Sequence, residues 1–293
     1  EKLLGEDLEW YCEDVHSRYG GDDKKFYDDI SGEELDGPLV LAAIREEMQE
    51  YRDHGVYEKV PLKECYDKTK KKPIGCRWVI VNKSDTRIPD YRARLVAKEI
   101  KRDSRDDLFA AMPPLEAKKL LFSLSQSLPG NSRGAYKLFF IDIKRAYFHA
   151  KAIRDVYVEL PEQDSAPGMC AHLLKSMYGT RDAAQNWERE YTRTLVGLGF
   201  LPGLATPCVF YHPTRDIRIV VHGDDFTALA SSVDGRWLCD QIKKNYKVKV
   251  RGILGGEASD DKSIRILNRV VTWGESGIVY EPDQRHSELI VKQ

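Results

Sequence analysis

The sequence has no apolar run long enough to cross a membrane, and its longest runs, such as residues 39–44, have the size of core segments. It also has no signal peptide, no internal repeat and no low-complexity tract. It starts at Glu1 rather than Met, so we expect it to be a piece of a longer protein. Hydrophobic residues make up 42% and charged residues 32%, as in a soluble globular protein. A length of 293 residues allows one large domain or two ordinary ones.

Paired cysteines are also missing. The six cysteines are scattered and form no CxxC motif: Cys12, Cys65, Cys76, Cys170, Cys208 and Cys239. This spacing predicts free thiols in a reducing intracellular compartment and argues against a zinc site.

The net charge of −1 is close to zero, but the charges are unevenly distributed. Residues 1–37 contain 13 Asp and Glu against 4 Lys and Arg, whereas residues 63–105 contain 14 Lys and Arg against 6 Asp and Glu. A basic central segment can contact phosphates although an acidic flank cancels its charge in the total. The alternative is that the lysine run at 68–72 is a solvated loop.

The pattern of apolar residues predicts helices mixed irregularly with strands, which favours an α+β fold. Residues 1–37 are acidic and rich in turn-forming pairs, and we expect a poorly ordered leader there. We predict helices at 38–54, 115–128 and 187–198, and strands at 76–81, 91–96, 138–143, 217–221 and 226–230.

Asp224 and Asp225 stand between two apolar strands, where Gly223 and Asp224 fit a two-residue hairpin turn with positive φ at the glycine. Asp142 ends another apolar run. Three carboxylates converging from two strands suit Mg²⁺, a hard cation that takes oxygen ligands. An Asp-Asp pair also occurs in turns simply because Asp tolerates turn geometry, so this pair alone does not define a metal site.

Six motifs follow one another along the chain: YRARLVAK at 91–98, FIDIKRAYF at 140–148, VYVELP at 156–161, LKSMYG at 174–179 followed by Trp187, GF at 199–200 with CVF at 208–210, and VHGDD at 221–225. Together, and in this order, they resemble the motifs of the reverse transcriptases of copia-type retrotransposons (Pseudoviridae). The resemblance runs from about residue 38 to the end. The chain departs from the family pattern at His222-Gly223 in place of the Tyr-Val of YVDD, at Glu99 in place of a glycine, and at 181–185, which lack a proline.

The resemblance implies a right-hand polymerase fold with fingers, an antiparallel palm sheet and a partial thumb. It would divide the chain into the leader at 1–37, fingers and palm at 38–281, and the start of a truncated thumb at 282–293. Within residues 245–274, segments 252–255 and 264–267 resemble a strand pair that grips the primer.

The implied activity is that of an RNA-directed DNA polymerase, which uses two Mg²⁺ ions, or Mn²⁺ in their place, to transfer nucleotides from dNTPs. Its partners would be an RNA or DNA template and a DNA or tRNA primer, with integrase and ribonuclease H regions in a parent Pol polyprotein and no membrane. Its location would be a cytoplasmic virus-like particle, with the DNA product destined for the nucleus.

The resemblance also assigns the acidic and cationic residues of the site. Asp142 and Asp224 would hold the two ions, with Asp225 beside them as a supporting carboxylate. Cations of the fingers would meet the triphosphate, and Arg94 is our first choice, followed by Arg92 and Lys98.

The remaining assignments concern the nucleotide. The backbone N–H groups of Arg145 and Ala146 would meet phosphate oxygens, and Tyr147 would lie beneath the sugar and exclude a ribose 2′-hydroxyl. Tyr178 and Gly179 would lie near the templating base or the incoming nucleotide.

Other interpretations stay open. The finger cations are individually consistent with ordinary strand-face residues, and we expect core packing from Phe148, Trp78, Trp187 and His222. An RNA-dependent RNA polymerase is disfavoured because Tyr147 is bulky where a ribose would need room. A decayed or co-opted element that only binds nucleic acid is the non-enzymatic alternative.

Overall fold

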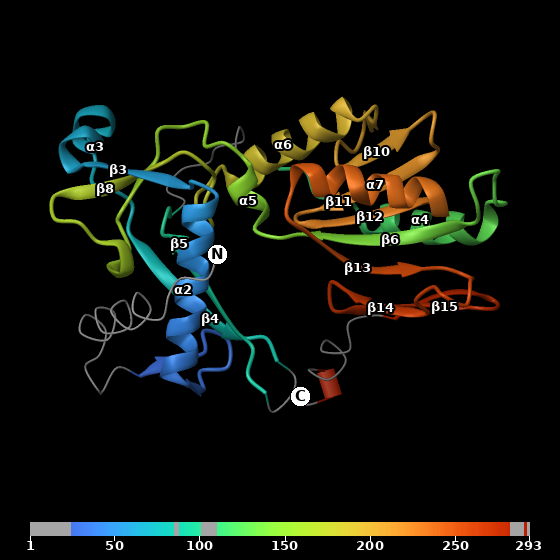
Figure 1. The fold of residues 1–293 in the computed structure, drawn as a ribbon, viewed down its shortest axis with the longest axis horizontal. Helices are drawn as coiled ribbons and strands as arrows, with labels where there is room; N and C mark the ends of the chain where they lie inside the picture. Colours follow the sequence, from blue (N-terminus) through green and yellow to red (C-terminus); the bar gives the residue numbers. More distant parts are fainter. Residues whose placement is uncertain (1–24, 85–87, 101–109, 282–289, 292–293) are drawn as a thin grey trace, which may run out of the picture. The chain divides into compact units, whose positions relative to one another are not determined.

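The computed structural model describes residues 25–84, 88–100, 110–281 and 290–291. The chain divides into two compact units (Figure 1). Unit 1 comprises Glu1–Ser104 and Lys151–Ala183, and unit 2 comprises Arg105–Ala150 and Ala184–Gln293.

Within its described residues, unit 1 contains short antiparallel sheets, two α-helices and one 3₁₀ helix. Its sheets are β1–β2, β4–β5 and β3–β8–β7. Its elements are β1 (Phe26–Tyr27), β2 (Glu34–Leu35), α2 (Gly37–Asp53), β3 (Tyr57–Pro61), α3 (Leu62–Thr69), β4 (Cys76–Asn82), β5 (Tyr91–Ala97), β7 (Tyr157–Val158), η2 (Glu162–Asp164) and β8 (Met169–Leu173).

Helix α2 begins where the sequence supplies a cap and a proline. The Asp36 carboxylate accepts a hydrogen bond of 3.0 Å from the N–H of Leu39, and Pro38 lies in the first turn, where it sacrifices no helical hydrogen bond. The helix packs against β5 through Val40 and Ile44, which join Ala93 in one buried cluster.

The expected leader is partly ordered. Residues 1–24 lie outside the described part of the chain, but β1 and β2 pair within the segment that we expected to be poorly ordered. The Asp28 carboxylate accepts backbone hydrogen bonds from Ile30, Ser31 and, across the unit, Asn82. The leader prediction is therefore wrong for this stretch, because acidic composition concealed a carboxylate that satisfies three backbone donors.

Unit 2 is built on a six-stranded antiparallel sheet in the order β13-β6-β12-β11-β10-β9 (Figure 1). Its elements are α4 (Leu115–Ser127), β6 (Tyr136–Ile143), α5 (Ala146–His149), α6 (Ala183–Gly197), β9 (Leu201–Pro202), β10 (Val209–His212), β11 (Ile217–His222), β12 (Asp225–Ser231), α7 (Ser232–Asn245), β13 (Val248–Leu254), β14 (Ser263–Ile266), β15 (Arg269–Gly274) and β16 (Gly277–Tyr280).

Both faces of the central strands β6 and β12 are buried, which explains their nearly continuous apolar sequences. Residues of β6 alternate: Phe139 and Ile141 join the cluster formed with α6 and α7, whereas Leu138 and Phe140 join the cluster formed with α4. The two clusters hold β6 and β12 rigidly at the centre of the sheet.

The predicted elements are confirmed, with α6 beginning four residues earlier than expected. The expected pairing of segments 252–255 and 264–267 is wrong. Strand β13 pairs with β6, and β14 pairs with β15 in a separate three-stranded sheet. Within the described residues, no helix is long and apolar enough to cross a membrane.

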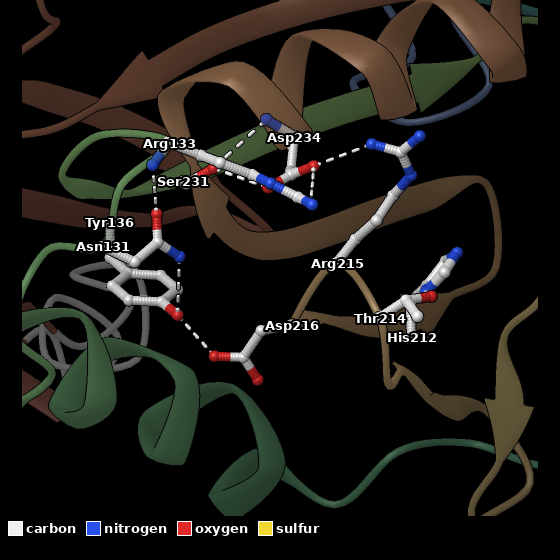
Figure 2. Close-up of polar contacts among 9 residues, drawn as sticks. All are labelled: Asn131, Arg133, Tyr136, His212, Thr214, Arg215, Asp216, Ser231 and Asp234. Atoms are coloured by element: carbon white, nitrogen blue, oxygen red, sulfur yellow. Dashed lines mark hydrogen bonds and ion pairs between the residues drawn. The ribbon is translucent and has the colours of Figure 1, made fainter.

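A buried carboxylate secures one end of unit 2 (Figure 2). Asp234, in the first turn of α7, is 0% exposed and receives Arg133 at 3.0 Å and Arg215 at 2.9 Å on one oxygen. The Ser231 hydroxyl donates to its other oxygen at 2.8 Å. These contacts join α7 to the segment before β6 and to the turn between β10 and β11.

Candidate active site

Two of the three predicted acids are direct partners on adjacent strands. Asp142 near the end of β6 lies opposite Asp225 at the start of β12. Directly opposite residues of antiparallel strands project from the same face, with Cβ atoms about 4.5–5.5 Å apart. That face is the one that α4 covers further along the sheet.

The third acid lies in the turn between β11 and β12. His222 pairs with Asp225, which leaves Gly223 and Asp224 as the two central residues. Gly223 has a φ of 63°, as predicted for the first position of this turn. The N–H of Ile143, next to Asp142, donates to the carbonyl of Asp224 at 2.9 Å, so β6 fixes the turn beside its own acid.

The charge around Asp225 is concentrated and only partly compensated. Burial raises the pKa of the Asp225 carboxyl, and the Asp224 and Asp142 carboxylates add to this, while Arg251 and Lys118 oppose it. Arg251 lies at the bulge of β13, with Nη1 3.4 Å from Asp225 Oδ1. Lys249 on β13 is also directly opposite Asp142, so three cations lie near the three acids at this end of the sheet.

Lys118 was not predicted and is unusual in being buried. It lies in the first turn of α4 and is 2% exposed. Burial lowers the pKa of its ammonium, against the opposing influence of Asp225. Burial, together with Lys118, also lowers the pKa of His222. The sequence around Lys118 does not reveal its burial, because a solvent-exposed lysine can occupy the same position in an amphipathic helix.

The side chains do not form a completed metal cage. Among the residues that the structure describes, no group of three or more His, Cys, Asp or Glu side chains is arranged as a metal-binding cluster. The acids are nevertheless gathered at one end of two paired strands, with Asp224 exposed and Asp142 and Asp225 half-buried.

The segment after Asp142 turns away from the sheet as expected. The N–H of Lys144 donates to the carbonyl of Lys247 at 2.8 Å, and Arg145 adopts a left-handed conformation with a φ of 51°. Ala146 then begins the short helix α5. Tyr147 is half-buried against the α6–α7 cluster, and Phe148 is fully buried, which confirms the expected core role of Phe148.

The predicted cations lie on one strand of unit 1. Arg92 and Arg94 alternate with the buried Ala93 and Leu95 on β5, so both arginines are on the face opposite α2. Lys98 follows the strand, and its N–H donates to the carbonyl of Gly75 at 2.8 Å. The structure therefore places Arg92 and Arg94 on one face of β5 and Lys98 directly after the strand.

Arg94 also meets two other predicted residues. Its guanidinium carbon lies 5.1 Å from the centre of the Tyr178 ring, within cation–π range. The Tyr178 carbonyl accepts a hydrogen bond of 2.8 Å from the N–H of Ala97. At Gly179, with a φ of 83°, an added Cβ would lie 2.0 Å from the carbonyl oxygen of Ala97, so only glycine fits. Arg94 and Tyr178, which are 84 residues apart in the sequence (178 − 94 = 84), thus lie in contact. We call Tyr178 and Gly179 the platform.

A partly buried network of ion pairs lies just after the same strand, and it was not predicted from the sequence. Arg154 contacts Glu99 through both terminal nitrogens at 3.0 Å and Asp182 at 2.6 Å. The N–H of Arg181 donates to Glu99 at 2.8 Å. The only available signal was that Glu99 and residues 181–185 both departed from the family pattern.

The sequence matches the family model described as reverse transcriptase (RNA-dependent DNA polymerase) over residues 63–255. The chain belongs to this family. The predicted fold class, an α+β right-hand polymerase with an antiparallel palm sheet, is thereby confirmed, as is the enzyme class. The match includes the acids, the β5 cations and the Tyr178–Gly179 platform.

Relatives of this reverse transcriptase chain are polyproteins of plant and yeast transposons. It is 27% identical over 190 residues to the retrovirus-related Pol polyprotein from transposon TNT 1-94 of Nicotiana tabacum, covering 62% of this chain and 14% of that protein. It is 24% identical over 176 residues to the Pol polyprotein from transposon RE1 of Arabidopsis thaliana, covering 55% and 12%. It is 24% identical over 212 residues to the Ty1-GR1 Gag-Pol polyprotein of Saccharomyces cerevisiae, covering 70% and 11%.

Solved structures resemble the chain more distantly. Telomerase from Candida albicans, in complex with a fragment of telomeric RNA, has a TM-score of 0.45 and 10% identity, covering 85% of this chain and 52% of that one. The foamy viral protease-reverse transcriptase in complex with double-stranded DNA has a TM-score of 0.41 and 10% identity, covering 84% and 36%.

Proposed function

We propose that the chain is the reverse transcriptase domain of a copia-type retrotransposon Pol polyprotein and that it adds deoxynucleotides to a primer on an RNA or DNA template. The observation that carries this proposal is the pairing of Asp142 with Asp225 across β6 and β12, with Asp224 in the adjoining turn. Partial burial of a carboxylate costs desolvation free energy, and a cation bound by these acids would offset that cost.

These acids fit a divalent cation by the chemistry of their donors. All are carboxylates, and burial with two neighbouring carboxylates raises the pKa of Asp225, a repulsion that a bound cation would relieve. Asp142 and Asp224 would hold Mg²⁺ or Mn²⁺, with Asp225 supporting them. When bound, such ions polarise phosphoryl oxygens and lower the pKa of an attacking hydroxyl.

The residues of the chain itself would bind and orient the substrates. Arg94, stacked on Tyr178, presents a guanidinium suited to phosphate oxygens, and Arg92 on the same face of β5 and Lys98 directly after the strand would add charge. Arg145 and Ala146 would offer backbone N–H groups, Tyr147 would select the sugar, and Gly179 would let the platform approach a base.

A second candidate function is nucleic-acid binding without catalysis, as in a decayed or co-opted element. It is favoured by the ion pair between Arg251 and Asp225, in which a protein cation already contacts one of the three acids. In this case the basic residues would bind a backbone whose affinity depends on salt, and no nucleotide would be incorporated.

Primer extension on poly(rA)/oligo(dT) tests both candidates. The wild-type chain should incorporate dTTP with Mg²⁺ or Mn²⁺, and Asp224→Asn should abolish incorporation because it removes a ligand charge without altering the core. Asp240→Asn is the matched control, since Asp240 is an exposed acid of α7 in the same unit. Extension by Asp224→Asn at the wild-type rate would show that the site is wrong.

A wild-type chain that binds the primer–template but extends it with neither metal would support the second candidate. Preference for UTP over dTTP by the wild type would instead favour an RNA polymerase.

A further inference from the structure

The turn that carries Asp224 is held by a helix that covers one face of the sheet and by the neighbouring strand. The indole N–H of Trp187, from α6, donates to the carbonyl of Gly223 at 2.8 Å. The N–H of Ile143, from β6, donates to the carbonyl of Asp224 at 2.9 Å. The two central carbonyls of this hairpin turn therefore each accept a hydrogen bond from outside the hairpin.

These two hydrogen bonds differ in what they fix. A two-residue hairpin turn has two favoured forms: type I′ has positive φ at both central residues, and type II′ has positive φ at the first alone. Gly223 has a φ of 63°, and Asp224 is not among the residues with positive φ, so the turn is type II′. The two forms interconvert by rotation of the central peptide, whose carbonyl belongs to Gly223.

Neither residue of the turn prevents this rotation by itself. Glycine accepts both forms, and Asp is one of the few side chains that tolerate positive φ. The rotation would make the φ of Asp224 positive and turn its carboxylate in a new direction. The hydrogen bond from Ile143 lies on the next peptide and does not distinguish the two forms. The hydrogen bond from Trp187 acts on the rotating carbonyl itself.

The donor is rigidly placed. Trp187 is 1% exposed, and its ring forms edge-to-face contacts with Tyr191 at 5.6 Å and with Tyr246 at 5.2 Å. Tyr246 is fixed in turn by a hydrogen bond of 2.6 Å from its hydroxyl to Thr194. An indole has a single donor, so this buried N–H has no second use.

We propose that Trp187 is a positioning residue that locks the peptide between Gly223 and Asp224 in its type II′ form and thereby aims the Asp224 carboxylate. The consequence for catalysis rests on the function proposed above for Asp224. The lock itself is a property of the turn and can be measured without activity.

The test compares Trp187→Phe with a matched control. Phenylalanine keeps an aromatic ring in the cluster but removes the N–H donor. Tyr246→Phe removes the hydroxyl that contacts Thr194 and Glu190 in the same cluster and does not touch the turn. Both variants should lose stability, measured by urea unfolding, while the turn should change in Trp187→Phe alone.

Amide NMR spectra of the ¹⁵N-labelled chain report the turn directly. The amides of Asp224 and Asp225 should give single signals in the wild type and in Tyr246→Phe, and split or exchange-broadened signals in Trp187→Phe. The dissociation constant for Mn²⁺ should rise by about tenfold or more in Trp187→Phe, as is typical when a group that orients a ligand is lost. In primer extension, kcat should fall between about ten- and hundredfold, with the KM for dTTP little changed.

A Trp187→Phe chain with single turn signals and an unchanged Mn²⁺ constant would overturn the lock, whatever its activity. Equal effects of the two variants on turn and metal would also overturn it, because they would reflect cluster packing. If the wild type neither binds Mn²⁺ nor extends a primer, the proposed function fails, and the amide signals alone then decide whether the lock exists.

Discussion

The guanidinium of Arg154 donates one hydrogen bond to each carboxylate oxygen of Glu99, both 3.0 Å long, and one of 2.6 Å to Asp182. Both acids are mostly buried, with side chains 16% and 6% exposed. These contacts raise the pKa of Arg154, chiefly through Asp182, so the guanidinium stays charged. One cation therefore neutralises two acids that are 83 residues apart in the sequence (182 − 99 = 83).

Arg154→Met should destabilise unit 1, because it leaves two buried carboxylates without their shared cation. We expect a loss of about 1.5–3 kcal/mol in the free energy of unfolding, the range for hydrogen bonds to charged groups. Urea denaturation at neutral pH measures it. Lys63→Met is the control, since Lys63 pairs with Asp67 on the surface, and it should leave stability unchanged. Equal stability of the two variants would show that the network is not a stabilising contact.

The strands and helices could be predicted because their apolar periods are strong. The Asp142 and Asp225 strands, for example, have both faces buried and read as continuous apolar runs. The hairpin turn at Gly223 was predictable because glycine at its first position has a local geometric cause. Register could not be read from the sequence, so the pairing of Asp142 with Asp225 came from the structure alone.

Tertiary charge contacts escaped prediction for a different reason. Lys118, Arg154 and Arg251 interact with carboxylates that are distant in the sequence. Their neighbours in the sequence therefore give no indication of these contacts. The order of residues 26–35 escaped because an acidic composition says nothing about Asp28 accepting three backbone hydrogen bonds.

Arg94→Ala should raise the KM for dTTP more than Arg92→Ala, because the Arg94 guanidinium is oriented by Tyr178 and Arg92 is exposed.

Changing Arg92, Arg94 and Lys98 together should also weaken primer–template binding and flatten its dependence on salt by roughly one slope unit per lost phosphate contact. Fluorescence anisotropy at several salt concentrations measures the slope. Lys63→Ala is the control, because Lys63 is an exposed cation of α3 in the same unit and pairs with Asp67 at 2.9 Å. An unchanged slope in the triple variant would place these cations away from nucleic acid.

Asp234 contacts Arg133, Arg215 and Ser231 (Figure 2), and we expect these contacts to make the stability of unit 2 sensitive to acid. Burial would raise the pKa of Asp234, but hydrogen bonds from Ser231 and Arg215 and the charge of Arg133 outweigh it and lower the pKa. A carboxyl with a depressed folded pKa contributes stability above its unfolded pKa, about 3.9 for Asp, and loses it as the pH falls through the folded value.

Asp234→Asn should therefore lower the free energy of unfolding by about 1.5–3 kcal/mol at pH 7, the range for hydrogen bonds to charged groups. The loss should be no larger, because water can partly solvate both arginines once they lack their partner. The difference from wild type should shrink as the pH falls below about 4. Urea unfolding at a series of pH values measures it, with Asp240→Asn as the exposed control. A difference that is constant with pH would mean that the charge of Asp234 is not what stabilises α7.

Tyr147 is the predicted selector of the sugar, and it lies in the same unit as the acids, five residues after Asp142 (147 − 142 = 5). Its ring is half-buried against the α6–α7 cluster, so the backbone turn at Arg145 and the core together fix its direction. Tyr147→Phe keeps the ring and is the matched variant. Tyr147→Ala removes it.

A ribose would press its 2′-hydroxyl against this ring, and overpacking of that kind costs about 1–3 kcal/mol. At about 1.4 kcal/mol per tenfold, the ring should favour dTTP over UTP by roughly ten- to hundredfold. Tyr147→Ala should lose this preference, with a smaller loss in the use of dTTP, whereas Tyr147→Phe should retain it. The ratio of kcat/KM for dTTP and UTP on one RNA template measures the effect. A ratio that is the same in wild type and in Tyr147→Ala would make Tyr147 a packing residue and place sugar selection elsewhere.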